Sequence, residues 1–294
     1  MTWFGICGMQ LHVGADGGNV DYLCRRIEMM AHAFPWVQMV VLSELAPHGP
    51  RPDLAEPLPG PSEQRFCTLA EQLGLWIVTG SMYERDHAHR YNTCSVIAPD
   101  GAVVGRYRKM FPFLPYSDGV EPGREFFTFD VAGVGRFGLS ICYDMWFPET
   151  SRTLAAMGVD VILHPVMTPT IDRDVELAIA RATAATNQVF VVDINGVGAG
   201  GVGRSLVVGP NGDVLHQAGQ NEELIPIELD LARVAHCRER GLNGLGQPLK
   251  SFRDAPVEFD VYRPDSPRRQ YLATLGPLVK PARPPVGTTR KDRA

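Results

Sequence analysis

Residues 137–149 read Phe-Gly-Leu-Ser-Ile-Cys-Tyr-Asp-Met-Trp-Phe-Pro-Glu, so that an apolar run ends abruptly at a thiol. A stretch with helical character follows at residues 150–157. This pattern is typical of a nucleophile at a turn between a strand and a helix, where backbone N–H groups at the helix start can receive negative charge. It predicts that Cys142 meets a substrate at the edge of a sheet.

Two charged residues also stand next to strand-like runs. Glu44 closes the apolar run at residues 37–43, and Lys109 follows Gly-Arg-Tyr-Arg at residues 105–108. Taken singly, each of these residues has an ordinary explanation, because a buried cysteine is usually packing and a charged residue is usually solvated. An acid, a base and a thiol in the order Glu44, Lys109, Cys142 together predict a site where several strands end at one sheet edge.

The motifs resemble those of the nitrilase, or carbon–nitrogen hydrolase, superfamily, in its aliphatic-amidase-like branch. Residues 105–109 resemble the lysine motif of that family, and residues 141–144 with residues 147–149 resemble its cysteine motif. Further similarity lies downstream, in Arg181, Ala182, Asn187, Gln188, Asn195, residues 203–205 and residues 209–212. The resemblance implies a four-layer αββα sandwich. Strand-like and helix-like runs that alternate, with hairpins between some strands, independently favour an α/β sandwich.

The domain organisation follows from length and composition. With 294 residues and 45% hydrophobic content, the chain can bury one large core, and its apolar runs continue to residue 231 without a linker. We predict a single hydrolase domain at residues 1–262. Residues 263–294 are predicted to form a C-terminal arm, either at an oligomer interface, as the resemblance implies, or partly disordered. A homodimer or a higher homo-oligomer is expected.

Charge and cysteine usage exclude several function classes. A net charge of −5 without a long Lys/Arg cluster gives no reason to expect nucleic-acid binding. The longest apolar stretches are far shorter than the roughly 20 residues needed to cross a bilayer, so no membrane partner is expected. Six cysteines without a Cys-x-x-Cys pair, and no signal-peptide pattern, favour the cytoplasm. We expect no metal and no cofactor, since His87 and His89 lack further ligands at suitable spacing.

The resemblance also implies a chemistry. It predicts a cofactor-independent thiol hydrolase that cleaves the carbon–nitrogen bond of a small, linear, non-peptide amide through an acyl-thioester enzyme. Glu44 is then the general base, and Lys109 lowers the thiol pKa and stabilises the oxyanion together with the backbone N–H of Tyr143. Acyl transfer by the same triad, nitrile hydrolysis, and a catalytically weakened binding or assembly protein are the alternatives.

The sequence departs from the family pattern at one position. The family commonly has a second glutamate a few residues after the lysine, and this chain has Ser117 there, followed by Asp118 and Glu121. Either carboxylate can substitute for the missing one, with Asp118 favoured, or Ser117 can complete the site with a water. The candidates for lining the substrate pocket, with plain core packing as their alternative, are Phe113, Tyr116, Trp146, His164 and Met167.

Overall fold

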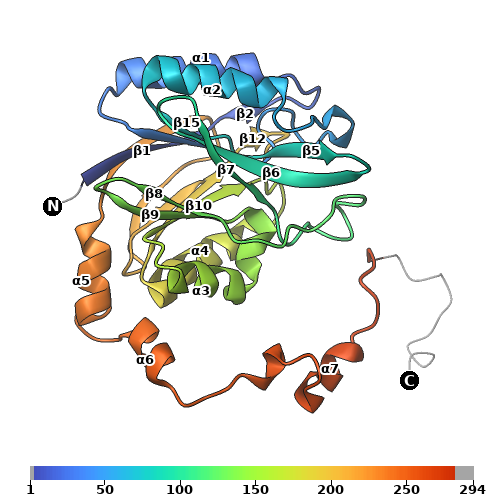
Figure 1. The fold of residues 1–294 in the computed structure, drawn as a ribbon, viewed down its shortest axis with the longest axis vertical. Helices are drawn as coiled ribbons and strands as arrows, with labels where there is room; N and C mark the ends of the chain where they lie inside the picture. Colours follow the sequence, from blue (N-terminus) through green and yellow to red (C-terminus); the bar gives the residue numbers. More distant parts are fainter. Residues whose placement is uncertain (1–2, 282–294) are drawn as a thin grey trace.

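A computed structural model describes residues 3–281 of the chain. Two β-sheets pack face to face, and a pair of helices covers the outer face of each sheet (Figure 1). The molecule is therefore the α/β four-layer αββα sandwich that the sequence motifs predicted. Among the described residues, no helix is both long and apolar enough to span a membrane.

The first sheet has seven strands in the order β15-β1-β3-β4-β6-β5, with β7 paired to β6. Its strands are β1 (Trp3–Gln10), β3 (Met39–Leu42), β4 (Trp76–Val78), β5 (Met82–Asp86), β6 (His89–Ile97), β7 (Val103–Arg108) and β15 (Glu223–Asp230). Strands β1, β3 and β4 run parallel, and the remaining pairs are antiparallel. Helices α1 (Val20–Ala33) and α2 (Pro61–Leu73) cover its outer face (Figure 1).

The second sheet has six strands in the order β14-β13-β11-β10-β9-β8. They are β8 (Thr128–Val131), β9 (Gly135–Leu139), β10 (Val161–Val166), β11 (Phe190–Asn195), β13 (Leu206–Val208) and β14 (Val214–Gln217). Helices α3 (Pro148–Ala156) and α4 (Arg173–Asn187) cover its outer face, so β9, β10 and β11 form a parallel centre buried on both sides. A two-stranded ribbon pairs β2 (His12–Val13) with β12 (Val197–Gly198).

The main core lies between the two sheets. Phe4 of β1 and Phe137 of β9 meet there with ring centroids 5.4 Å apart, and Phe129 packs on Phe137 at 5.5 Å. The residues of β3 and β10 are buried throughout, because each of these strands has a sheet on one side and helices on the other. Helix α1 turns Leu23, Ile27 and other apolar residues toward its sheet.

Three strand ends meet at one edge of the sandwich. Strand β3 ends two residues before Glu44, β7 ends immediately before Lys109, and β9 leads to Cys142, the first residue of the short 3₁₀ segment η2 (Cys142–Trp146). The backbone N–H of Glu44 donates to the carbonyl of Val166 at the end of β10, with 3.2 Å between N and O. This bond joins the two sheets at the edge where the three residues lie.

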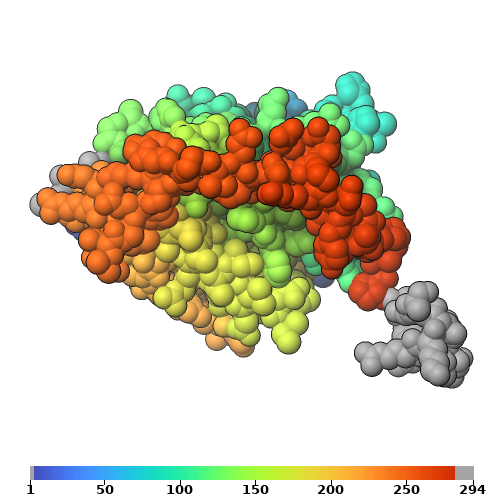
Figure 2. Space-filling view, turned by 90° about the horizontal axis from the view of Figure 1, so that it is seen from below, coloured from blue at the N-terminus to red at the C-terminus, as the bar shows by residue number. Residues whose placement is uncertain are grey.

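The chain leaves the sandwich after α5 (Ala232–Arg240). The segment beyond it contains α6 (Pro248–Asp254), η3 (Asp260–Tyr262), η4 (Pro267–Arg269) and α7 (Gln270–Ala273). It runs below α3 and α4 in Figure 1 and crosses one face of the molecule in Figure 2. The ring centroid of Phe252 in α6 lies 5.3 Å from the guanidinium carbon of Arg152 in α3. The division at residues 262 and 263 stays a prediction, and residues 282–294 of the expected arm lie outside the described residues.

Candidate active site

Cys142 has a backbone conformation that is uncommon for a residue with a side chain. Its φ is +46°, in the left-handed region, at the point where β9 passes into η2. Strain of this kind persists only where the surrounding structure imposes it, and it gathers at functional sites. The turn brings the thiol to the sheet edge, where Sγ lies 3.8 Å from Oγ1 of Thr168.

Glu44 and Lys109 form a buried ion pair beside this thiol. Lys109 Nζ donates to Glu44 Oε1 over 2.7 Å, and Asn92 Nδ2 of β6 donates to the same oxygen over 2.8 Å. Both charged residues are only 3% exposed. Among residues 3–281, the second carboxylate oxygen, Oε2, takes part in no hydrogen bond. One oxygen is thus fixed by two donors while the other is left for a reacting proton.

Burial sets the ionisation of the thiol. Burial and then the negative charge of Glu44 raise the pKa of Cys142 well above its ordinary value, and the charge of Lys109 offsets this only in part. Burial also lowers the pKa of Lys109, but Glu44 and other nearby negative groups outweigh it, so the net pKa is raised. Lys109 therefore acts on the thiol in the expected direction, yet the resting thiol is protonated and needs a base.

Asp144 holds the turn in place. Its carboxylate accepts hydrogen bonds from the Tyr107 hydroxyl at 2.7 Å, the Phe111 N–H at 2.8 Å and the Ile141 N–H at 2.9 Å. Burial raises the pKa of Asp144 to about 6 although Lys109 and these donors oppose it. The carboxylate thus links the nucleophile turn to β7 and to the loop after Lys109.

Replacing Asp144 with asparagine is expected to loosen this turn. The amide group must face at least one of the three donors with its NH₂, so the free energy of unfolding should fall by about 1–3 kcal/mol. Misplacement of the thiol should lower kcat by about 10²-fold. Thermal unfolding and ammonia release measure the two effects. Asp130→Asn, which removes the carboxylate of an exposed ion pair with Arg136, is the control; full activity in Asp144→Asn would contradict the role.

A cavity of about 490 Å³ opens over the three residues. Glu44, Lys109 and Cys142 all line it, as does Tyr143. Among residues 3–281, the backbone N–H of Tyr143 has no hydrogen-bond acceptor, so it is available to a ligand. The predicted pocket residues that line this cavity are Phe113, Tyr116, Trp146 and Met167.

His164 was predicted to line the pocket, and the structure places it elsewhere. It is 3% exposed on β10, outside the cavity lining, with Nδ1 3.2 Å from the carbonyl of Ser140 and Nε2 3.8 Å from Asp193. Burial lowers its pKa to about 4, so the ring is neutral at physiological pH. Its polar contacts are thus with Ser140 and Asp193 and not with the cavity.

The three residues considered for the position of the second glutamate do not all lie at the cavity. Ser117 and Asp118 line the cavity, whereas Glu121 lies on the neighbouring surface and pairs with His89. The expectation for Glu121 is corrected, because its hydrogen bond with the His89 ring holds its side chain outside the cavity lining. Within the described part of the chain, the Lys109 ammonium donates a hydrogen bond only to Glu44. No second carboxylate among residues 3–281 forms a hydrogen bond or ion pair with the lysine.

Three residues of the site were not among the predicted ones. Asn92 holds Glu44, Thr168 contacts Cys142, and Glu176 of α4 contributes a carboxylate to the cavity wall. Trp146 Nε1 donates to Glu176 Oε1 at 3.4 Å. None of the three lies in a recognisable motif next to the cysteine. Only the tertiary packing of the chain brings them to the site.

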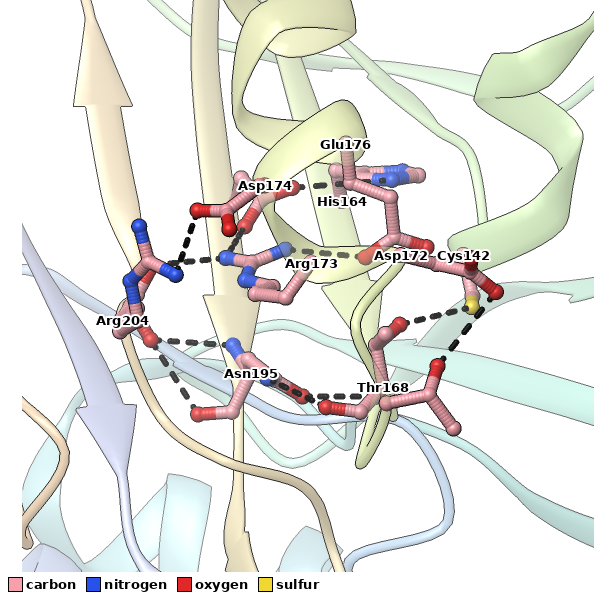
Figure 3. Close-up of polar contacts among 12 residues, drawn as sticks. Cys142, His164, Thr168, Asp172, Arg173, Asp174, Glu176, Asn195 and Arg204 are labelled. Atoms are coloured by element: carbon pink, nitrogen blue, oxygen red, sulfur yellow. Dashed lines mark hydrogen bonds and ion pairs between the residues drawn. The ribbon is translucent and has the colours of Figure 1, made fainter.

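Glu176 belongs to a buried ionic network (Figure 3). Arg173 lies between Glu176, whose Oε2 accepts at 3.3 Å, and the carboxylate of Asp193, and it also donates to the carbonyl of Arg204 at 2.8 Å. The guanidinium of Arg204 in turn pairs with Asp174 at 2.7 Å. Arg173 is thus held by buried acids, whereas Arg204 pairs with the exposed Asp174.

The sequence of the chain matches a known protein family. The family described as carbon–nitrogen hydrolase matches residues 17–239. This chain belongs to the carbon–nitrogen hydrolase family. The match spans both sheets and includes Glu44, Lys109 and Cys142. Among residues 3–281, no three side chains of His, Cys, Asp or Glu gather in an arrangement that could hold a metal ion.

Similar proteins agree with this assignment. Human omega-amidase NIT2 is 32% identical over 261 residues, which is 82% of this chain and 93% of that protein. The corresponding omega-amidase of Bos taurus is 33% identical over the same shares. The named relatives are omega-amidases, so the branch is a distant variant of the aliphatic-amidase-like one that the sequence motifs resemble.

Solved structures of this carbon–nitrogen hydrolase family superpose closely on the chain. Nit3 of Saccharomyces cerevisiae, a member of branch 10 of the nitrilase superfamily, gives a TM-score of 0.75 at 28% identity and covers 81% of this chain and 94% of its own. A carbon–nitrogen hydrolase from Helicobacter pylori gives 0.78 at 25% identity, covering 89% and 99%. The sandwich is therefore shared across the family.

Proposed function

We propose that this carbon–nitrogen hydrolase cleaves small, linear, non-peptide amides through an acyl-thioester on Cys142. The observation that carries the proposal is the arrangement of Glu44, which offers one free carboxylate oxygen to the cavity that also holds the Cys142 thiol. Similarity to proteins named omega-amidases supports the choice of amides.

The first half of the reaction forms the thioester. Glu44 takes the thiol proton as Sγ attacks the amide carbon, which is necessary because burial keeps the resting thiol protonated. Negative charge then develops on the amide oxygen, where the Lys109 ammonium and the Tyr143 N–H can stabilise it. Glu44 passes its proton to the leaving nitrogen, the carbon–nitrogen bond breaks, and ammonia or an amine departs.

The second half releases the acid. Water enters the place of the leaving group, Glu44 removes one of its protons, and the hydroxide attacks the thioester carbon. The carbon–sulfur bond breaks, and the thiolate recovers the proton from Glu44. Asn92 keeps Glu44 in one position through both halves, since it donates to the oxygen that does not carry the proton.

Incubation of the purified full chain with butyramide tests the proposal. We expect ammonia and butyrate in equal amounts, and a butyryl adduct on the peptide that contains Cys142 by mass spectrometry. Butyronitrile in place of butyramide tests nitrile hydrolysis, and added hydroxylamine tests acyl transfer. Absence of both ammonia and adduct across a panel of short amides would favour a binding or assembly protein instead.

We also propose a homodimer or a higher homo-oligomer in the cytoplasm. Large apolar side chains along the C-terminal segment are mostly exposed, including Leu245 at 82% and Tyr271 at 72%, and a second copy of the chain can cover them. All six cysteines are free thiols, in keeping with a reducing compartment. Light scattering of the full chain, compared with a chain ending after residue 262, tests the role of the segment.

A further inference from the structure

The charges that line the catalytic cavity are mostly negative. Among the described residues of the lining, Lys109 is the only basic one, and Glu44 pairs with it. Asp118 and Asp172 line the same cavity without a basic partner among residues 3–281. Asp118 is exposed and Asp172 is half-buried with its carboxylate 3.4 Å from the Thr170 hydroxyl, so both lie toward solvent.

The nearby arginines cannot reverse this balance. Arg173 is fully buried and does not line the cavity, and its guanidinium is held by Asp193 and Glu176 (Figure 3). Arg204 is held by Asp174 outside the cavity. Among the described residues, a substrate carboxylate would therefore meet the carboxylates of Asp118 and Asp172 at the cavity mouth and no guanidinium on its walls. The ammonium of Lys280 lies at the edge of this region, beside Tyr116.

Aromatic rings form one wall of the same cavity. Tyr116 stacks on Phe113 at 5.1 Å between ring centroids, Phe113 meets Tyr143 at 5.0 Å, and Tyr143 meets Trp146 at 5.8 Å. The faces of such rings attract cations. The ring of Tyr116 already has one beside it, because Nζ of Lys280 lies 5.5 Å from its centroid.

We propose that the amide substrate carries a cationic group, an ammonium or a guanidinium, at the end of its acyl chain. The amide lies at Cys142, and the cation lies at the mouth between the aromatic wall and the carboxylates of Asp118 and Asp172. This inference rests on the amide hydrolysis proposed above and adds the charge of the substrate. It sets the chain apart from an enzyme that recognises a carboxylate on its substrate.

Three amides of similar length test the charge preference on the full chain. They are δ-aminovaleramide with an ammonium group, hexanamide as its neutral isostere, and glutaramic acid with a carboxylate. We expect kcat/KM for δ-aminovaleramide to exceed that for hexanamide by about tenfold, with glutaramic acid lowest. Added salt should reduce the preference, because charges at an open mouth are screened.

Substitutions at the cavity mouth test whether Asp118 and Asp172 cause the preference for a cationic substrate. Asp172→Asn and Asp118→Asn should each lower the ratio of kcat/KM for δ-aminovaleramide to that for hexanamide by about fivefold. The ratio is the readout because a partial loss of folded enzyme lowers both kcat/KM values by the same factor and leaves their ratio unchanged. Asp174→Asn is the matched control: it removes the same charge two residues after Asp172, in the first turn of α4 and outside the cavity, and its ratio should equal that of the wild type.

The outcomes separate this inference from the proposed function. Hydrolysis of hexanamide with no preference for the cation, or with glutaramic acid as the best substrate, would overturn the inference and leave the amidase function intact. If none of the amides is hydrolysed, the amidase function fails, and calorimetric binding to the Cys142→Ala variant decides the charge preference. Tighter binding of δ-aminovaleramide than of hexanamide supports it, and equal or weaker binding overturns it.

Discussion

Cys142→Ala should reduce amide hydrolysis to the background rate. The thiol makes the covalent bond on which both halves of the reaction depend, and removal of a nucleophile from such a set costs on the order of 10⁶ in kcat. The fold should survive, because the change deletes one atom beside an open cavity and is expected to cost about 1 kcal/mol. Ammonia release measures the first effect and thermal unfolding the second.

Cys67→Ala is the matched control for this variant. Cys67 of α2 has the same 9% exposure as Cys142 and does not line the cavity. It should keep the activity of the wild type. Ammonia release by Cys142→Ala at an appreciable fraction of the wild-type rate would mean that another group is the nucleophile.

Lys109→Met should lower both activity and stability. Loss of the cation that faces the developing oxyanion is expected to reduce kcat by about 10²–10³-fold. It also leaves the carboxylate of Glu44 buried without its ion-pair partner, which typically costs about 3–5 kcal/mol in the free energy of unfolding. Steady-state kinetics and denaturant unfolding report the two losses separately.

The double variant Glu44→Gln/Lys109→Met separates catalysis from folding. With the uncompensated charge removed, stability should return toward that of the wild type, while activity stays lost because neither the base nor the cation is present. A Lys109→Met enzyme with a raised KM and an unchanged kcat would show instead that the lysine only binds substrate.

The sequence next to each strand end was enough to predict that Glu44, Lys109 and Cys142 lie together at one sheet edge. Along β7, side chains alternate between the two faces of the sheet, so Tyr107 turns inward to Asp144 while Arg106 and Arg108 turn outward to Glu63 and Glu84. Lys109 continues the inward set, which explains why a lysine that follows an arginine reaches the site.

Other parts of the site could not be predicted because their positions depend on distant packing. His164 lies on a strand buried on both faces, where alternation does not tell which face meets the cavity. The direction of Glu121 depends on the partner that its loop finds, which is His89 of β6. Glu176 reaches the cavity only because α4 packs against the segment that contains Trp146.

The left-handed backbone of Cys142 has a consequence for how this sequence can change. A side chain at φ +46° is disfavoured relative to glycine, so the enzyme keeps a less stable residue at the one position where its thiol is required. Selection for thermostability alone would favour glycine at this position and yield a more stable but inactive protein. Stabilising this enzyme by library selection therefore requires a screen for turnover at every round.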